Sequence, residues 1–376
     1  MLLRKLDILN FKNIPDASLE LSTGVNCLIG SNGMGKSNLL EAIYYLSMGR
    51  GSRSLSDNEL VRHGENQMLL RGHYSDSKEA DALQLDVSIG WSEGSRKRLR
   101  RDGKDCRRLS DHIGAVPVVL AEPSDLLLIT GSAEERRRLM DNVISQADPA
   151  YMQHLQRYNE ALKQRNAMLR QGISDPILME SVEVQLTQSA SLIAETRARW
   201  CEEIAPQFAS YYALIAPDSE KASLTYQPSV NSGFAPSDFA EALSQSRQRD
   251  GILGHTTTGP HRDDIALTLS GYDVRRIGSQ GQMKSFTIAL RLALYGYLAS
   301  HSHTLPILLL DDIFDKLDAD RVERIVATVT SPEMTFGQIF ITDTNRKHID
   351  SILSRVAGEY KLFNVDHGQF SLISQS

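Results

Sequence analysis

The sequence of 376 residues predicts an α/β protein whose α/β lobe is interrupted by a mainly α-helical second lobe. Short apolar runs typical of buried strands occur in both terminal parts of the chain: VNCLIG at 25–30, PILLLDD at 306–312 and GQIFITD at 337–343. Between them, apolar residues recur at helical spacing from about residue 133. We therefore expect residues 1–127 and 253–376 to form one lobe, and residues 128–252 to form the helical lobe.

The N-terminal part predicts strands around a glycine-rich loop and a helix. Residues 2–14 alternate apolar and polar side chains, as a half-buried strand does, and the run at 25–30 predicts a second strand. Apolar residues at helical spacing then predict a helix that stops near Gly49. Further short strands are predicted at 83–91, in the basic stretch around residues 102–103 and at 115–120, and the Asp-Gly pair at 102–103 favours a hairpin turn.

The middle of the chain predicts two long helices. The first carries tyrosines and leucines at spacings of three, four or seven and ends near Gly172. The second begins at Asp175, a good N-cap, with Pro176 at the first helical position. Pro206 is expected to kink or end it. The short connection predicts an antiparallel helical hairpin.

Composition excludes several classes of protein. No apolar run approaches the roughly 20 residues that cross a bilayer, and the first residues carry charges, so we expect a soluble, cytoplasmic protein without membrane association. Cys27, Cys106 and Cys201 are far apart, which gives little support for a disulfide framework or a zinc site. The formal net charge of −6 does not indicate a nucleic-acid binder, although it describes only the average surface.

Residues 30–37 match the pattern G-x-x-x-x-G-K-[ST] of a phosphate-binding loop. Its glycines let backbone N–H groups turn toward phosphate oxygens, and the helix that follows directs its positive end to the same anion. A chance glycine turn is the alternative, which the preceding strand and the following helix disfavour. The residues expected to bind ATP are Gly30, Ser31, Asn32, Gly33, Met34, Gly35, Lys36 and Ser37.

Within this loop, Lys36 is expected to reach the β- and γ-phosphates, and Ser37 to offer its hydroxyl to Mg²⁺. Such a loop needs a carboxylate at the end of a buried strand, and Asp311 is the expected Mg²⁺ partner. Asp312 follows it directly and is placed to act as a catalytic base toward water. The alternative is that the two aspartates only cap the strand end.

A second glycine-containing segment, Ser279, Gln280, Gly281 and Gln282, precedes a helical stretch and would also present N–H groups to an anion. We call these four residues the signature segment. Together with the loop and the LLLDD run, it resembles the ATPase heads of the ABC type found in structural-maintenance-of-chromosomes and recombination proteins. That resemblance implies an ABC-type head with a mixed sheet around the phosphate loop. It also implies a dimer, in which the signature segment of one subunit closes over the γ-phosphate held by the other.

Further motifs narrow the resemblance to the RecF family of bacterial recombination mediators, over essentially the whole chain. They are Leu6-x-Ile8-x-Asn10-Phe11-Lys12-Asn13, the segment at 118–126, Arg136-Arg137-Arg138-Leu139-Met140-Asp141, Gln164-Arg165-Asn166 and Gly259-Pro260-His261-Arg262-Asp263-Asp264. The resemblance implies ATP-dependent DNA binding in recombinational repair and replication. It also implies recombinase loading at gapped or single-stranded/double-stranded DNA junctions, with RecO- and RecR-type partners.

The chain departs from common ABC heads in two places. Where many have a glutamine between strand and helical lobe, this chain has residues 122–125, Glu-Pro-Ser-Asp. Where many have a switch histidine after the last core strand, residues 339–344 have none, and His348 belongs to a following helix. Slow, DNA-stimulated hydrolysis is therefore expected. His261 is expected to be a structural residue.

The candidate DNA contacts lie in the basic hairpin around residue 100. Its residues are Arg96, Lys97, Arg98, Arg100 and Arg101. Phosphate contacts need such local positive charge, although a solvated hairpin that carries charges against aggregation is an equal alternative. Two rival functions stay open: an ATP-binding scaffold without significant hydrolysis, and another ABC-type ATPase subunit such as that of a transporter.

Overall fold

The computed structural model describes residues 1–52, 56–77, 79, 84–173, 175–217, 220–315, 317–331, 336–356 and 358–376. The chain divides into two compact units. Unit 1 consists of Met1–Asp125, Tyr211–Asp218 and Ser279–Ser376, and unit 2 consists of Leu126–Ser210 and Ser219–Gly278. The α/β lobe is therefore built from both terminal parts of the chain.

The first sheet of unit 1 is antiparallel and has the strand order β2-β1-β4-β5-β6-β7. Its strands are β1 (Leu2–Phe11), β2 (Ile14–Glu20), β4 (Gln67–Ser75), β5 (Gln84–Ser92), β6 (Arg98–Arg101) and β7 (Lys104–Asp105). Side chains alternate between a buried and a more exposed face along β4, as the pleat requires. Asp102 and Gly103 have φ of 50° and 74° and join β6 to β7, which confirms the predicted two-residue hairpin turn.

The second sheet has the order β15-β14-β3-β13-β12-β8. Its strands are β3 (Val25–Ile29), β8 (Val118–Ala121), β12 (Ile307–Asp311), β13 (Ile339–Asp343), β14 (Tyr360–Asp366) and β15 (Gln369–Gln375). All pairs are parallel except β14 with β15, so the sheet is mixed, as predicted. Strands β12 and β13 are buried along their whole length, which explains their continuous apolar sequences.

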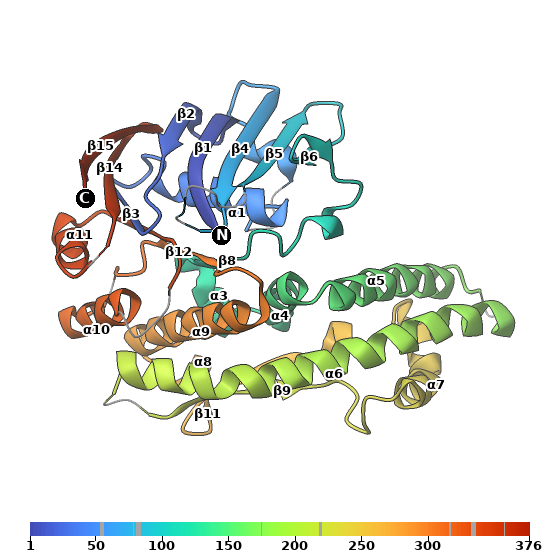
Figure 1. Ribbon diagram of the computed structural model, residues 1–376. Coiled ribbons are helices and arrows are strands. Elements are labelled where there is room, and N and C mark those ends of the chain that lie inside the picture. The colour runs from blue at the N-terminus through green and yellow to red at the C-terminus, as the bar shows by residue number, and fades with distance from the viewer. Residues whose placement is uncertain are drawn as a thin grey trace. The chain divides into compact units, whose positions relative to one another are not determined.

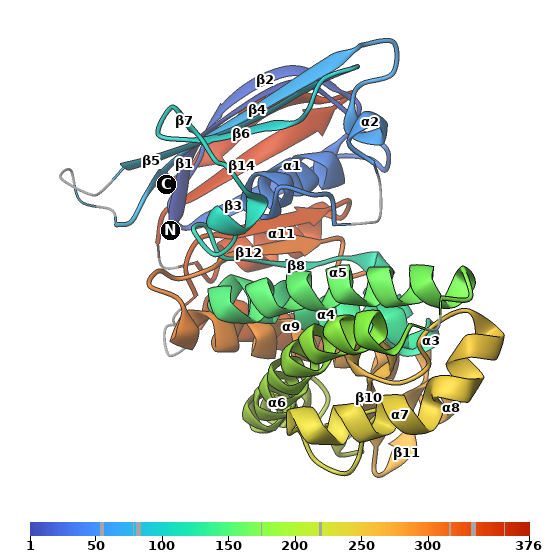
Figure 2. The same cartoon turned by 90° about the vertical axis from the view of Figure 1, so that its right-hand side faces the viewer.

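Helix α1 (Lys36–Met48) lies between the two sheets of unit 1, as Figure 2 shows. Its leucines, tyrosines and Met48 join side chains of both sheets in one hydrophobic core. The helix ends at Gly49, which has φ of 62° and donates its N–H to the Tyr45 carbonyl, as the sequence predicts. Unit 1 also contains α2 (Asp57–Leu60), α9 (Gln280–His301), α10 (Ala319–Thr330) and α11 (Arg346–Leu353).

Unit 2 is mainly helical, as predicted, and contains a small sheet (Figure 1). Its helices are α3 (Leu127–Thr130), α4 (Ala133–Ala147), α5 (Pro149–Arg170), most of α6 (Pro176–Ile215), α7 (Pro236–Leu253) and α8 (Val274–Ile277). The sheet has the order β11-β10-β9, with strands β9 (Ala222–Gln227), β10 (Asp264–Leu269) and β11 (Tyr272–Asp273). The sequence-based boundary at 252 differs from this division, because β10 pairs with β9 and keeps residues 253–278 in unit 2.

Helices α5 and α6 form the predicted antiparallel hairpin. Arg165 on α5 contacts Glu183 on α6 near the connection, and Tyr151 contacts Arg197 further from it. The Asp175 carboxylate caps α6, since it accepts the N–H groups of residues 177 and 178 at 2.9 and 3.2 Å. The helix continues through Pro206 to Ile215, so Pro206 does not end it.

The string at 259–264 lies at the centre of unit 2. The buried Asp263 carboxylate accepts hydrogen bonds from Arg197, from the Tyr226 hydroxyl and from the Ser229 N–H. Asp264 pairs with Arg136 of α4 through two hydrogen bonds, at 2.6 and 2.9 Å. These contacts join helix α4, helix α6 and the sheet.

Candidate nucleotide-binding site

The phosphate loop connects β3 to α1, and steric constraints explain why it contains glycines. Gly33 and Gly35 have φ of 80° and 116°, a region that side chains rarely adopt. A Cβ atom on Gly30 would lie 2.3 Å from the Val365 carbonyl oxygen. The chain therefore needs glycine at these positions for the strand to turn into the helix.

The N-terminus of α1 suits an anion. No side chain among the described residues caps it, and its first turn carries no acidic residue. The first N–H groups of a helix have no partner within the helix, so here they face the loop without a competing carboxylate. Ser31, Asn32 and Gly33 are exposed, and nothing lies within 4 Å of the Cβ position of Gly33. The loop is thus open on the side where a phosphate would enter.

Lys36 folds back over this loop. Its Nζ donates to the carbonyl oxygens of Gly30 and Ser31, at 2.6 and 3.0 Å. Burial lowers the pKa of Lys36 below its usual value, and the carboxylates of Asp312 and Asp311 act in the opposite direction. A phosphate that took the place of these two carbonyl oxygens as acceptor would find the Lys36 amine already inside the loop.

Asp311 ends β12 and receives two hydroxyl groups on one carboxylate oxygen. Ser37 Oγ donates to Oδ1 at 2.8 Å, and Thr342 Oγ1 donates to the same atom at 2.6 Å. Thr342 lies beside Asp311 in the register between β12 and β13. Burial raises the pKa of Asp311, and the two hydroxyl donors oppose that effect. The predicted pair Ser37 and Asp311 is thus brought together, with hydroxyl and carboxylate oxygens of the kind that Mg²⁺ prefers.

Asp312 follows in a left-handed backbone conformation, with φ of 47°. Its N–H donates to the carbonyl and the hydroxyl oxygens of Thr342, at 3.2 and 3.0 Å. Burial raises the pKa of Asp312, and the negative charges of Asp343 and Asp315 raise it further. A carboxyl group with a raised pKa is suited to accept a proton from water.

Two further acidic residues stand at the same edge of the sheet. Ala121 of β8 pairs with Leu310, so Glu122 comes next to Asp311 in the register. Asp343 ends β13 and its Oδ2 lies 2.7 Å from Nδ1 of His348, on α11. The His348 ring also packs edge-on against Phe314. The end of β13 carries no histidine itself, but His348 contacts it from the following helix, α11.

Two asparagines and a turn between strands hold the loop from behind. Asn13 Nδ2 donates to the Gly33 carbonyl at 3.1 Å, and its Oδ1 accepts from Asn38 Nδ2 at 2.7 Å. The N–H of Gly368, in the turn between β14 and β15, donates to the Met34 carbonyl at 2.8 Å. Asn13 and Asn38 lie in motifs of the sequence, but only the fold shows that they meet.

The signature segment begins α9. Ser279 Oγ accepts the Gln282 N–H, and Gln282 Oε1 accepts the Ser279 N–H, which forms a capping box. A Cβ atom on Gly281 would lie 2.2 Å from an Nη1 atom of Arg321. Glycine at 281 thus leaves room for a guanidinium beside the helix start, and Arg321 is a further residue that sequence reasoning missed.

The basic hairpin uses some of its charges within the chain. Lys97 Nζ donates to the Gly49 carbonyl at 2.7 Å and contacts the Asp57 carboxylate at 3.0 Å. Arg100 pairs with Asp105 at 2.7 Å, and both side chains are exposed. Arg101 donates to the Asp111 carbonyl at 3.2 Å. Lys97 therefore holds the hairpin to the end of α1, while the other arginines lie on its surface.

His261 lies in unit 2, apart from the residues that surround the phosphate loop in unit 1. Its Nδ1 accepts from the Tyr158 hydroxyl at 2.6 Å, and its Nε2 contacts the Thr256 carbonyl at 3.0 Å. A carbonyl only accepts, so Nε2 carries a proton, and in the neutral ring Nδ1 is then free to accept from Tyr158. Burial lowers the pKa of His261 to about 4.

Comparison with known proteins decides the family. The sequence model of the RecF/RecN/SMC N terminal domain matches residues 2–366. The chain is 45% identical over 369 residues to the DNA replication and repair protein RecF of Porphyromonas gingivalis W83, covering 98% of this chain and 99% of that protein. The chain belongs to the RecF family. The RecF of Parabacteroides distasonis is 42% identical, with 98% of each chain covered.

Solved structures of the RecF family have the same fold. The structure of the recombination mediator protein RecF-ATP in the RecFOR pathway matches with a TM-score of 0.88 and 28% identity, over 99% of this chain and 98% of that chain. An Smc head domain from Pyrococcus furiosus matches with a TM-score of 0.59 and 17% identity, over 100% of this chain and 96% of that chain. The predicted ABC-type head fold is confirmed: a RecF- and SMC-head-like ATPase fold with a helical region.

No helix in the described ranges is long and apolar enough to cross a membrane.

Proposed function

We propose that this chain binds ATP and Mg²⁺ at residues 30–37 and acts in DNA repair and replication. The observation that carries the proposal is one oxygen of Asp311 that accepts hydrogen bonds from the Ser37 and Thr342 hydroxyls. Ser37 lies in the first turn of α1, whose N-terminus has no side-chain cap among the described residues. The names of the relatives, DNA replication and repair protein RecF, support the process. The solved structure of RecF-ATP, a relative at 28% identity, supports the nucleotide.

Different residues of this chain have different roles at the proposed site. The loop N–H groups and the start of α1 bind the phosphates, and Lys36 exchanges its bonds to Gly30 and Ser31 for phosphate oxygens. Ser37 and Asp311 hold the metal, with Thr342 fixing the carboxylate. Mg²⁺, when bound, neutralises negative charge on the phosphates. Asp312 accepts the proton of the attacking water, and its raised pKa supports that role.

We further propose that two copies of the chain share each ATP. The loop of one copy would hold the nucleotide, and the signature segment of the other, Ser279, Gln280, Gly281 and Gln282, would close over it. The capping box at the start of α9 supports this role, because it fixes the start of a helix whose first N–H groups have no partner within the helix itself. ATP binding then joins two heads around DNA, and hydrolysis releases them.

Sedimentation tests the proposal directly. The Asp312→Asn variant, which keeps the loop but lacks the base, is expected to shift from monomer to dimer when ATP and Mg²⁺ are added. Lys36→Ala is the matched control, since it removes the phosphate contact from the same site and is expected to stay monomeric. A monomer at saturating ATP in Asp312→Asn would reject the shared site.

An ATP-binding scaffold without significant hydrolysis is the second candidate, favoured by the strand end of β13, which carries Asp343 instead of a histidine. Phosphate release, measured with and without DNA, separates the two candidates. Activity above that of Lys36→Ala, raised by DNA, supports a slow DNA-stimulated ATPase. Activity equal to that of Lys36→Ala supports the scaffold.

For DNA, we propose that Arg96, Arg98, Arg100 and Arg101 contact phosphates, and that Lys97 positions the hairpin. The DNA would be gapped or a junction between single and double strands, where the protein, in the cytoplasm, promotes recombinase loading with RecO- and RecR-type mediators. DNA binding across a salt series, with and without ATP, tests this: the slope measures phosphate contacts, and the effect of ATP measures coupling. No change on adding ATP would reject the ATP-dependent clamp.

A further inference from the structure

Strand β10 of unit 2 has one open edge. On one side it pairs with β9 along its whole length. On the other side it pairs with β11 only at Thr268 and Leu269, where Ser270 and Gly271 form a tight turn with φ of 47° and 84°. Beside residues 264–267 the described part of the chain places no strand on that side. The Ile265 N–H already donates to the Asp264 carboxylate at 2.7 Å, so the edge can still pair with another extended chain around Leu267.

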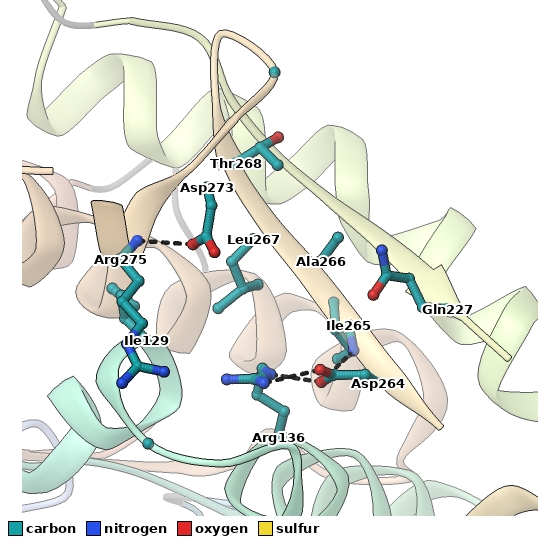
Figure 3. Close-up of a pocket in the computed structure, with 12 residues that line it drawn as sticks. Ile129, Arg136, Gln227, Asp264, Ile265, Ala266, Leu267, Thr268, Asp273 and Arg275 are labelled. Carbon is teal, nitrogen blue, oxygen red and sulfur yellow. Dashed lines mark hydrogen bonds and ion pairs between the residues drawn. The ribbon is translucent and has the colours of Figure 1, made fainter. Parts of the chain in front are cut away.

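The open edge forms one wall of a cavity of about 330 Å³, drawn in Figure 3. This volume lies at the lower end of the ~300–1,000 Å³ typical of binding pockets. The rest of the wall comes from α3 and the glycine that follows it, from α4, from the ends of β9 and β11, and from the start of α8. The side chains that matter are the apolar Ile129 and Leu267 and the charged Arg136, Asp264, Asp273 and Arg275.

Two of the lining residues are glycines, and one of these positions has no room for a side chain. A Cβ atom on Gly131 would lie 2.5 Å from the Leu127 carbonyl oxygen. On Gly271, at the end of the β10–β11 turn, a Cβ atom would meet nothing within 4 Å. The cavity therefore has backbone instead of side chains at both places, which leaves room for a second main chain.

The charges inside the cavity leave one cation available. Asp264 is saturated by Arg136, whose Nε and Nη2 donate to it, while Nη1 donates to the Leu128 carbonyl at 2.8 Å. The Asp273 carboxylate caps α8 by accepting the Arg275 N–H at 2.9 Å. The guanidinium of Arg275 is exposed, and within the described residues it forms no ion pair. The cavity thus offers one positive charge beside an open strand edge and an apolar surface.

We propose that this cavity is a docking site for an extended, acidic segment of a partner protein, which adds as a short strand beside β10 and places a carboxylate on Arg275. Main-chain hydrogen bonds to a strand edge give affinity to such an addition, and neighbouring side-chain pockets give it selectivity. The apolar contacts of Ile129 and Leu267 suit a side chain of that segment. A nucleic-acid phosphate would use Arg275 alone and would leave the strand edge and the apolar wall without a role.

Peptide display on the full-length protein tests the proposal. Random dodecapeptides are selected on the wild-type chain after depletion on Ala266→Phe, a variant that fills the cavity from β10. The enriched peptides are synthesised with a fluorescein label and titrated by fluorescence polarisation. Arg275→Glu is the test variant, and Arg276→Glu is its matched control, because Arg276 is equally exposed on α8 but does not line the cavity.

We expect the enriched peptides to share an acidic residue within an extended, β-prone sequence. Their Kd should rise about tenfold or more in Arg275→Glu, as expected for loss and reversal of a charged pair, and less than about twofold in Arg276→Glu. Circular dichroism confirms that each variant is folded. Equal losses in both variants, or no enrichment over the depleted background, would overturn the proposal. So would displacement of the peptide by DNA together with weaker DNA binding in Arg275→Glu, which would make the cavity a nucleic-acid contact.

Discussion

One carboxylate oxygen of Asp311 receives hydroxyl groups from two distant parts of the chain, Ser37 and Thr342. If Ser37 bound the proposed Mg²⁺ through its hydroxyl, Thr342 would be the donor that still fixes the carboxylate. Thr342 is fully buried, so water does not compete with Asp311 for its hydroxyl group. The geometry of the proposed metal site would therefore depend on a residue that is not itself one of the proposed metal ligands.

Thr342→Val keeps the shape of the side chain and removes this hydroxyl. We expect the Mg²⁺ concentration needed for ATP binding to rise about tenfold or more, the usual cost of losing a group that orients a metal ligand. Titration of a fluorescent ATP analogue with Mg²⁺ measures it. Thr342→Ser is the matched control, since it retains the hydroxyl and should bind like wild type. Equal affinities in the valine and serine variants would mean that the hydroxyl does not position Asp311.

His261 makes the stability of the protein sensitive to acid. Burial lowers its pKa from the ordinary value of 6.5 to about 4, so the unfolded chain binds the proton first as pH falls. The stability from the neutral ring is complete above pH 6.5 and is lost as pH falls toward 4. A shift of this size corresponds to about 3 kcal/mol.

The advantage of wild type over His261→Gln in free energy of unfolding should therefore shrink by roughly this amount between pH 7 and pH 4. Urea titrations at several pH values measure it. The same substitution at the exposed His63 serves as the control, and its difference from wild type should stay nearly constant. A His261 difference independent of pH would contradict a neutral, buried ring.

At the scale of elements, the hairpin β6–β7 combines two tasks in neighbouring residues. Lys97 anchors it to the C-terminal end of α1, and the exposed Arg98 stands on its surface. Lys97→Ala should lower the melting temperature and leave the salt dependence of DNA binding unchanged. Arg98→Ala should leave the melting temperature unchanged and reduce the slope of log K against log salt by about 1. The same slope in wild type and Arg98→Ala would remove Arg98 from the DNA contacts.

Elements whose signals are local were predictable from the sequence. The phosphate loop with its strand and helix, the strands β12 and β13, the turn at residues 102–103 and the hairpin of α5 and α6 all follow from period, glycine or capping patterns. Pro206 was misleading on one point: a proline removes one N–H from a helix, but the packing of α6 keeps it continuous.

Long-range pairing accounts for what the sequence did not predict. Thr342 reaches Asp311 only because β12 and β13 are neighbours in one register, and Asn13 reaches Gly33 only because β1 ends behind the loop. Residues 253–278 join unit 2 because β10 pairs with β9, across more than 30 intervening residues. Sequence periodicity contains no information on which strands meet.

At the scale of the whole molecule, a shared site makes a prediction about mixtures. Lys36→Ala lacks a working loop, and a Ser279→Arg variant blocks the signature segment; each alone should lack ATPase activity. Mixed dimers contain one site in which the intact loop meets the intact signature. A one-to-one mixture should therefore recover about a quarter of wild-type activity, because half of the dimers are mixed and each has one working site.

Phosphate release on mixing measures this recovery, and a mixture of two different loop variants, Lys36→Ala and Ser37→Ala, is the control that should recover nothing. Activity in the single Ser279→Arg variant equal to that of wild type would show that the signature segment is not needed. No recovery in the mixture, with dimers present in sedimentation, would argue for sites completed within one chain.

The position of β3 between β13 and β14 has a consequence for synthesis of the protein. A ribosome that has delivered residue 330 has made the entire phosphate loop and neither of the two strands that flank β3. Because chains are synthesised at roughly 5–20 residues per second, many seconds pass between synthesis of the loop and synthesis of β13 and β14. A chain that ends before β13 therefore cannot assemble the proposed nucleotide site. The phosphate loop, although made early, depends on strands that are translated last.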